Sequence, residues 1–142
     1  MVVVLGGPGQ LGTAFRALLP EAAFPGRREI DLEDVGSLAT RIKALQPDVL
    51  INCAAYTDVD GAETDEATAT TVNSVAVGEL ARVANDMSIR FATFSSDYVF
   101  DGTSAVSYVE SSHPSPINAY GRSKLGGEDL ALRFAGSLIV RT

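Results

Sequence analysis

Two residues with acid–base chemistry lie four positions apart near the end of the chain. Tyr120 and Lys124 project from the same face if residues 119–134 form a helix. A phenol is a poor acid–base group at neutral pH because its pKa is about 10, and a neighbouring ammonium is expected to lower that pKa. The pair predicts proton transfer to or from a substrate oxygen, with the lysine free to hold a nicotinamide ribose. An ordinary surface pair is the alternative.

A hydroxyl-rich segment follows an apolar run at residues 90–94. It reads FSSDYVFDG and places Ser95 and Ser96 directly after the run. Ligands of parallel sheets bind at the carboxyl ends of strands, where a hydroxyl can hydrogen-bond a carbonyl that is being reduced. Two serines that only form a turn are the alternative.

A glycine-rich turn follows the first apolar run, residues 1–5. Gly6, Gly9 and Gly12 form a G-x-x-G-x-x-G pattern between this run and an amphipathic segment. Glycines there allow a tight turn, let the backbone approach a pyrophosphate, and let a helix sit near the sheet, with free N–H groups facing the phosphate. This arrangement predicts a dinucleotide site, against the alternative of a simple turn.

Two arginines follow the expected second strand, where an acidic residue would hold the 2′-hydroxyl of NAD. The chain reads Pro25-Gly26-Arg27-Arg28. Positive charge at this position suits a 2′-phosphate, so the sequence favours NADP(H) and leaves NAD(H) open. Two solvated surface arginines are an equally simple interpretation.

Short β-rich runs alternate with helical patterns along the chain. This alternation predicts an α/β domain with a doubly wound parallel sheet, a Rossmann fold, and strand order 3-2-1-4-5. Residues 101–118 lack periodicity and are expected to form a long loop, typical of functional or mobile segments. The expected strands are 1–5, 21–24, 48–52, 90–94 and 137–141, and the expected helices are 10–19, 34–45, 63–87 and 119–134.

Composition and charge exclude several classes of protein. The 142 residues carry a net charge of −7, which argues against a nucleic-acid binder and against general affinity for anionic membranes. Apolar residues make up 46% of the chain, which fits one folded domain, and no run approaches the length of a membrane span. The single cysteine, Cys53, rules out an internal disulfide, and with no signal peptide a cytoplasmic location is expected. Cys53 and the lone His113 are expected to be, respectively, a small buried residue and a solvated loop residue.

Four blocks of the sequence, in this order, resemble the dTDP-4-dehydrorhamnose reductases, a sugar-nucleotide branch of the extended short-chain dehydrogenases/reductases. The blocks read GGPGQLG, PDVLINCAAYTDVDGAE, FSSDYVFDG and INAYGRSKLGGE, and the resemblance covers essentially residues 1–142. It implies hydride transfer from NADPH or NADH to C4 of dTDP-6-deoxy-L-lyxo-4-hexulose, which gives dTDP-L-rhamnose.

The resemblance also implies roles for single residues. Tyr120 matches the general acid, Lys124 the ribose-binding lysine, and Ser96 a position that commonly holds threonine. The substrate pocket is implied to include Ser96, Thr57, Asp97 and Tyr98. The implied cofactor contacts fall into three groups, in addition to Arg27, Tyr120 and Lys124. Gly6, Gly9, Gln10, Leu11 and Gly12 lie beside the pyrophosphate. Asp31 and Leu32 lie near the adenine, and Ala54, Ala55 and Tyr56 lie beneath the cofactor.

The chain departs from the family pattern at two places. Ala14 replaces a glutamate that often helps bind Mg²⁺ at a dimer contact, so we expect no metal there, and the oligomeric state stays open. Val140-Arg141-Thr142 matches the start of a block that in the family continues for about as many residues again. We therefore expect a dinucleotide-binding domain over residues 1–142, without the substrate-binding part, that by itself turns over little sugar nucleotide.

Two other functions compete with the reductase. A non-catalytic NADP-binding regulatory subunit, like that of methionine adenosyltransferase, has a similar sequence. The intact set of Ser96, Tyr120 and Lys124 favours an enzyme lineage over this reading. A sugar-nucleotide epimerase or dehydratase is the third reading; a dehydratase normally carries acidic residues beside the strand hydroxyl, which Asp97 only partly satisfies.

Overall fold

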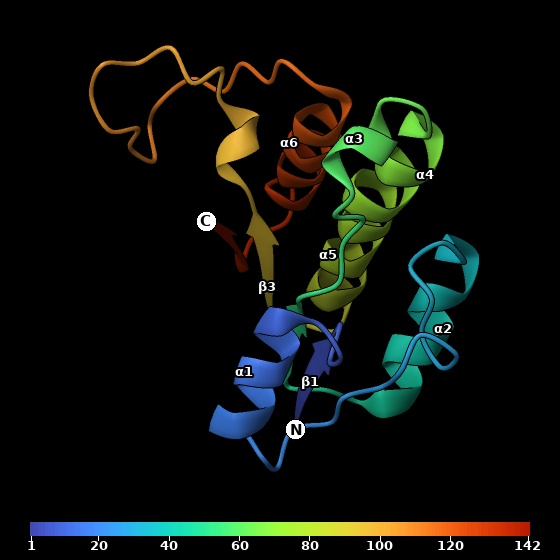
Figure 1. Ribbon diagram of the computed structural model, residues 1–142. Helices are drawn as coiled ribbons and strands as arrows, with labels where there is room; N and C mark the ends of the chain where they lie inside the picture. Colours follow the sequence, from blue (N-terminus) through green and yellow to red (C-terminus); the bar gives the residue numbers. More distant parts are fainter.

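The computed structural model describes residues 1–142, in which parallel strands alternate with helices (Figure 1). The strands are β1 (Val2–Leu5), β2 (Val49–Asn52), β3 (Arg90–Ser95) and β4 (Ser137–Arg141). The helices are α1 (Gln10–Leu18), α2 (Val35–Leu45), α3 (Val59–Ala62), α4 (Glu66–Thr70), α5 (Ala76–Asp86) and α6 (Ala119–Ala131), together with a π-helical turn η1 (Thr71–Val75) and a 3₁₀ turn η2 (Asp97–Val99). The predicted α/β class with a parallel sheet is confirmed.

The strand order differs from the expected one. The sheet runs β1-β2-β3-β4, and residues 21–24 add only an isolated parallel bridge between Ala23 and Val3. Ala23 exchanges hydrogen bonds with Val2 and Val4, whereas the Cys53 N–H donates to Leu5 O on the other edge of β1. In the numbering of the expected strands the order is 2-1-3-4-5, so the expected 3-2-1-4-5 is wrong. One bridge offers no edge for a further strand, and the segment of β2 pairs beside β1 instead.

Helices cover both faces of the sheet, as a doubly wound fold requires. Figure 1 shows α1 on one side and α2, α5 and α6 on the other. On the α1 side, the Phe15 ring packs against Phe94 of β3 with centroids 6.1 Å apart. On the other side lies the main core, because alternate strand residues point toward the apolar faces of the helices. Its largest fully buried side chains include Leu38, Ile42, Leu50, Leu80 and Phe91.

Two connections between the elements are irregular. The helix expected over residues 63–87 is interrupted, since α4 and α5 are joined by the π-helical turn η1, and α3 precedes them. Residues 101–118 form the expected long loop, which projects from the body of the molecule in Figure 1. Its base is held by Tyr108, whose ring stacks on Phe100 at 4.1 Å and whose hydroxyl donates to Asp101 at 2.9 Å. None of the helices is long and apolar enough to cross a bilayer.

Candidate functional site

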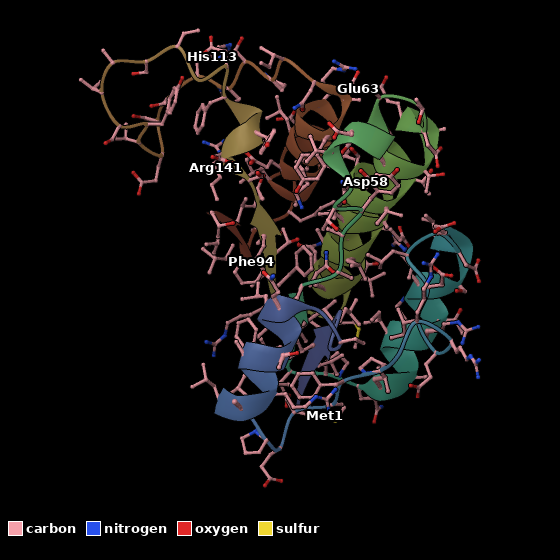
Figure 2. The ribbon with its side chains drawn as sticks, viewed as in Figure 1. Met1, Asp58, Glu63, Phe94, His113 and Arg141 are labelled. Carbon is pink, nitrogen blue, oxygen red and sulfur yellow. The ribbon has the colours of Figure 1, made fainter.

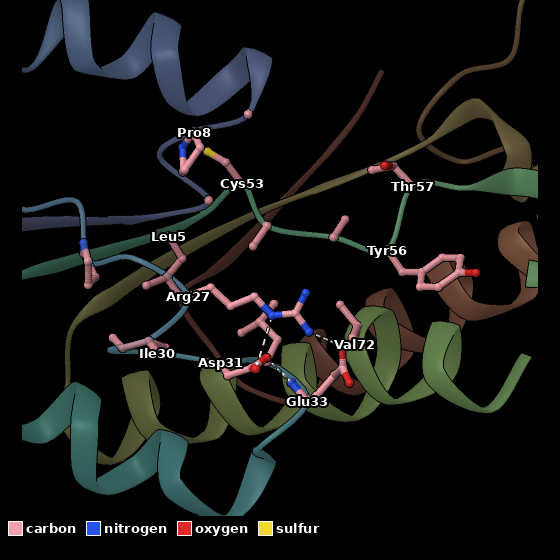
Figure 3. Close-up of a pocket in the computed structure, with 16 residues that line it drawn as sticks. Leu5, Pro8, Arg27, Ile30, Asp31, Glu33, Cys53, Tyr56, Thr57 and Val72 are labelled. Atoms are coloured by element: carbon pink, nitrogen blue, oxygen red, sulfur yellow. Dashed lines mark hydrogen bonds and ion pairs between the residues drawn. The ribbon is translucent and has the colours of Figure 1, made fainter. Parts of the chain in front are cut away.

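A cavity of about 410 Å³ opens at the carboxyl ends of β1 and β2 (Figure 3). The chain leaves β1 toward residues 21–24 on one side, whereas β2 pairs on the other side of β1. This reversal of direction leaves a crevice outside the strand ends, which is where open α/β sheets bind ligands. The lining residues are Leu5, Gly6, Pro8, Gly9, Pro25, Arg27, Ile30, Asp31, Leu32, Glu33, Cys53, Ala54, Ala55, Tyr56, Thr57 and Val72.

The glycine turn has the close backbone approach that a phosphate cradle needs. Gly6 has a φ of +79°, and a Cβ there would lie 2.6 Å from the backbone N of Ala54. A Cβ on Gly12 would clash with the carbonyl oxygen of Gly6, so this residue lets α1 pack against the turn. Gly9 is the N-cap of α1 and carries no side chain to cap the first N–H groups. These donors, at the positive end of a nine-residue helix, are free for an anion.

Charged side chains form a cluster on the rim of the same cavity. Arg27 Nε donates to Asp31 Oδ2 at 3.2 Å, and the Arg27 guanidinium also pairs with Glu33. The second carboxylate oxygen of Asp31 accepts the backbone N–H of Glu33 at 3.0 Å, which fixes the turn between them. Figure 3 shows the guanidinium between the two carboxylates. Arg28 is exposed and does not line the cavity, so only one of the two predicted arginines is in place.

The segment beneath the cavity is held by a residue that the sequence analysis missed. Asn73 is 1% exposed and lies in the π-helical turn η1. Its side-chain oxygen accepts the N–H of Tyr56 at 2.9 Å, and its amide donates to Tyr56 O and to Ser123 Oγ, both at 3.0 Å. Asn73 therefore joins the cavity floor directly to α6. A polar residue on the inner face of an otherwise apolar helical stripe is the signal that could have found it.

The predicted acid–base residues come together on α6 and at the end of β3. Tyr120 and Lys124 are both buried on α6, and the Lys124 Nζ donates to Phe94 O at 2.7 Å. Ser96 caps η2: its Oγ accepts the N–H of Tyr98 at 3.2 Å and donates to Asp97 Oδ1 at 3.1 Å. The rings of Tyr98 and Tyr120 meet edge to face with centroids 5.6 Å apart.

The protonation of this group differs from the expected one. Burial raises the pKa of Tyr120 above its ordinary value of 10.0; a hydrogen bond with Ser96 opposes this, and the charge of Asp97 adds to it. This upward shift is opposite to the one expected from the Lys124 ammonium, so that expectation is wrong for this structure. Burial in turn lowers the pKa of Lys124 to about 8, against a smaller opposing effect of Glu128. At neutral pH Tyr120 therefore holds its proton, as a general acid must.

Polar contacts at both ends of α6 fix this helix in place. At its N-terminus, Asn118 Oδ1 accepts the N–H of Gly121 at 2.7 Å, and Glu63 Oε1 accepts the N–H of Ala119 at 2.7 Å. One turn after Lys124, the buried Glu128 pairs with Arg141 of β4 at 2.5 Å. The position of Tyr120 is thus set by contacts from α3–α4 and from the sheet (Figure 2).

The structure divides the predicted residues into two neighbouring groups. Of the implied cofactor contacts, those at Gly6, Gly9, Arg27, Asp31, Leu32 and 54–56 line the cavity together with Thr57. Gln10, Leu11 and Gly12 lie beside it in the first turn of α1, and Ser96, Asp97, Tyr98, Tyr120 and Lys124 lie outside its lining. Tyr56 connects the groups, because its ring packs against the cluster that contains Tyr120.

The two residues expected to be inert lie in settings that agree with this. Cys53 is half-buried in the cavity wall, and burial raises the pKa of its thiol to about 11. It is therefore a poor nucleophile at neutral pH. His113 is exposed on the projecting loop, at the end of the molecule opposite Met1 (Figure 2). Ala14 is exposed on α1, and the expectation of no metal at this position stays a prediction.

The cavity has the features that a dinucleotide requires. Backbone N–H groups at the start of α1 suit a pyrophosphate, and the glycines leave room for close approach. The apolar wall beside Ile30 and Leu32 suits an adenine, and Arg27 and Asp31 offer polar groups to the adjoining ribose. Tyr120 and Ser96 can hydrogen-bond a carbonyl beyond the other end of the cavity.

Comparisons with known proteins agree with this geometry. The sequence model of the RmlD substrate binding domain family matches residues 1–142. A dTDP-4-dehydrorhamnose reductase of Burkholderia thailandensis is 43% identical over 130 residues, 89% of this chain and 44% of that protein. A dTDP-4-keto-6-deoxy-D-glucose reductase of Streptomyces niveus is 43% identical over 147 residues, 99% of this chain and 51% of that protein. The chain thus spans about half the length, or less, of the curated relatives it matches.

Solved structures resemble the whole chain. The dTDP-4-dehydrorhamnose reductase of Bacillus anthracis, crystallised with NADP, superposes with a TM-score of 0.92 at 31% identity, covering 99% of this chain and 52% of that one. A UDP-glucose 4-epimerase of Brucella ovis, in complex with NAD, superposes with a TM-score of 0.84 at 22% identity, covering 99% of this chain and 50% of that one, and shows the fold alone.

Proposed function

Because the chain belongs to the RmlD substrate binding domain family, we propose that it is the dinucleotide-binding domain of a dTDP-4-dehydrorhamnose reductase that prefers NADPH and accepts NADH. Its relatives are about twice as long. The reduction of the C4 keto group of dTDP-6-deoxy-L-lyxo-4-hexulose to dTDP-L-rhamnose is therefore proposed for this chain together with a substrate-binding part like theirs.

One observation carries the proposal: a phosphate cradle and a buried acid–base set are linked through Asn73. The cradle holds Gly6 and Gly12 at the start of the cavity, whereas Tyr120 lies on a helix more than one hundred residues later in the chain. Asn73 bonds to the floor of the cavity and to Ser123 on that helix. This link fixes the distance between cofactor and proton donor, which a reductase needs and a simple nucleotide-binding module does not.

The residues of this chain can be given roles in the reduction. The cofactor, when bound, supplies the hydride. The Tyr120 hydroxyl donates a proton to the developing alkoxide, and its raised pKa keeps it protonated until then. The Ser96 hydroxyl, which donates to Asp97 at 3.1 Å, turns toward the carbonyl oxygen when substrate is bound. Lys124 is held by Phe94 O and directs its remaining N–H groups toward the ribose.

The same proposal extends to the substrate, the partners and the location of the protein. The substrate lies against Thr57, Ser96, Asp97 and Tyr98, of which the last two are exposed at the end of β3. We expect no nucleic-acid partner, because a net charge of −7 opposes binding to phosphate backbones. Dinucleotide and sugar-nucleotide substrates are consistent with a cytoplasmic location.

Titration of NADPH and NADH into the 142-residue chain tests the cofactor site. We expect saturable binding of both, and Tyr120→Phe is expected to bind NADPH with a dissociation constant within about threefold of the parent, since a single hydroxyl is lost. Tyr108→Phe, on the projecting loop, is the matched control. In a protein that also carries the substrate-binding part, Tyr120→Phe is expected to abolish reduction; retained turnover would refute the assigned role.

A regulatory, non-catalytic NADP-binding subunit is the second candidate. It requires the cavity but not the proton donor. The buried Tyr120 and Lys124, held by contacts from Glu63 and Phe94, favour the enzyme. The same experiment separates the two functions, because a non-catalytic subunit binds NADPH but shows no reduction even with Tyr120 intact.

A further inference from the structure

The charged cluster on the rim of the cavity bears on the choice between the two cofactors. Arg27 is the only cationic side chain among the sixteen lining residues, and it is paired with two carboxylates. The three side chains together carry a net charge of −1. A 2′-phosphate therefore meets a cluster that repels it, even though the cluster contains the arginine best placed to bind it.

The two carboxylates are not equivalent. Asp31 is tied into the turn, since one of its oxygens accepts the backbone N–H of Glu33 while the other accepts from Arg27. Glu33 is exposed, and apart from the Arg27 guanidinium its carboxylate has no other partner. Its side chain can thus swing away from the arginine at little cost, whereas that of Asp31 cannot.

We propose that Glu33 is a specificity-determining residue, because its carboxylate holds the Arg27 guanidinium and competes with the 2′-phosphate of NADPH for it. Binding of NADPH displaces Glu33 from Arg27, and binding of NADH leaves the pair intact. The competition narrows the preference for NADPH and makes NADH an effective second cofactor. This inference rests on the proposed function, in that the cavity must bind the adenine-ribose end of a dinucleotide.

The charge of Glu33 is removed with little change of shape in Glu33→Gln. We expect this variant to bind NADPH about three- to fivefold more tightly, because binding no longer has to break the exposed Arg27–Glu33 ion pair, whose strength corresponds to a factor of about that size. Binding of NADH is expected to change by less than about twofold, because NADH has no phosphate there. Glu21→Gln removes the same charge at an exposed position outside the cavity lining and is the matched control.

A double-mutant cycle separates competition for Arg27 from simple repulsion of the phosphate. If Glu33 acts by holding the arginine, Glu33→Gln improves NADPH binding in the parent chain but not in Arg27→Ala. A gain of equal size in Arg27→Ala would show repulsion alone and overturn the proposal.

Dissociation constants of NADPH and NADH are measured by fluorescence titration of the parent and these variants at one fixed, low ionic strength. A gain restricted to NADPH and dependent on Arg27 supports the proposal. Equal gains for both cofactors overturn it, and so does weaker NADH binding, which would make Glu33 a ligand of the ribose hydroxyls. If neither cofactor binds the parent chain, the proposed function itself fails. This result is distinct from those that test only the role of Glu33.

Discussion

The buried lysine of α6 should make the stability of this protein depend on pH in a predictable way. Lys124 is 7% exposed, and burial lowers its pKa from 10.5 to about 8. Below pH 8 Lys124 is protonated in both the folded and the unfolded state, so the folded state carries the full free-energy cost of burying its charge. Between pH 8 and 10.5 only the unfolded state keeps the proton. The contribution of Lys124 therefore makes the protein more stable as pH rises through this window.

The size of the effect follows from the two pKa values. At about 1.4 kcal/mol for each pKa unit, the interval from 10.5 to about 8 corresponds to about 3 kcal/mol. Lys124→Met keeps the length of the side chain and removes the charge, at the cost of the hydrogen bond to Phe94 O, about 1 kcal/mol at every pH. We expect the variant to exceed the parent in free energy of unfolding by about 2 kcal/mol at pH 7 and to fall below it by about 1 kcal/mol at pH 10.5.

Urea unfolding of both proteins at a series of pH values from 7 to 10.5 measures this difference. Subtracting one curve from the other removes the pH-dependent contributions that the two proteins share. Lys43→Met, at the only other lysine of the chain, is the matched control because Lys43 is exposed on α2. A difference for Lys124→Met that stays constant with pH, like that of the control, would refute the argument, since Lys124 would then titrate alike in both states.

Two further substitutions test the cradle and the anchoring of α6. Gly12→Ala places a Cβ against the carbonyl oxygen of Gly6, so we expect a loss of about 2 kcal/mol in unfolding free energy and weaker NADPH binding. Gly36→Ala on α2 meets nothing within 4 Å, so it should leave NADPH binding unchanged and raise the unfolding free energy by at most about 1 kcal/mol through the helix propensity of alanine. Equal losses in the two variants would contradict the packing argument. Arg141→Ala leaves the carboxylate of Glu128 buried without its partner, and we expect a loss of about 2–3 kcal/mol in urea unfolding. Adding Glu128→Gln should recover part of that loss. If it does not, the loss in Arg141→Ala does not come from the unpaired buried carboxylate.

Local patterns were enough to predict the first strand and helix, helix α6, and the two motifs that they carry. The apolar β1, the glycines after it and the amphipathic α1 are adjacent in sequence, so their arrangement follows from short-range rules. The same holds for Tyr120 and Lys124, which share a helix face by spacing alone. These are the parts for which distant residues have little influence.

The strand order and the protonation of the site depend on distant contacts and could not be predicted in the same way. Residues 21–24 have a weak strand pattern, and only pairing with β1 shows that they form a single bridge. The pKa of Tyr120 is set by how deeply it is buried rather than by its spacing from Lys124. The pairing of Arg27 with Asp31 was not predicted, although the two residues have the i, i+4 spacing at which oppositely charged side chains often pair.

The hydrogen bonds of Asn73 have a consequence for how the protein loses its structure. They connect Tyr56, 17 residues earlier, and Ser123, 50 residues later, through one side chain in an irregular turn. Local opening of α6 therefore removes a support of the cavity floor as well, and the two parts open as one cooperative unit. We therefore expect the amide protons of the floor, such as that of Tyr56, to exchange faster whenever α6 opens.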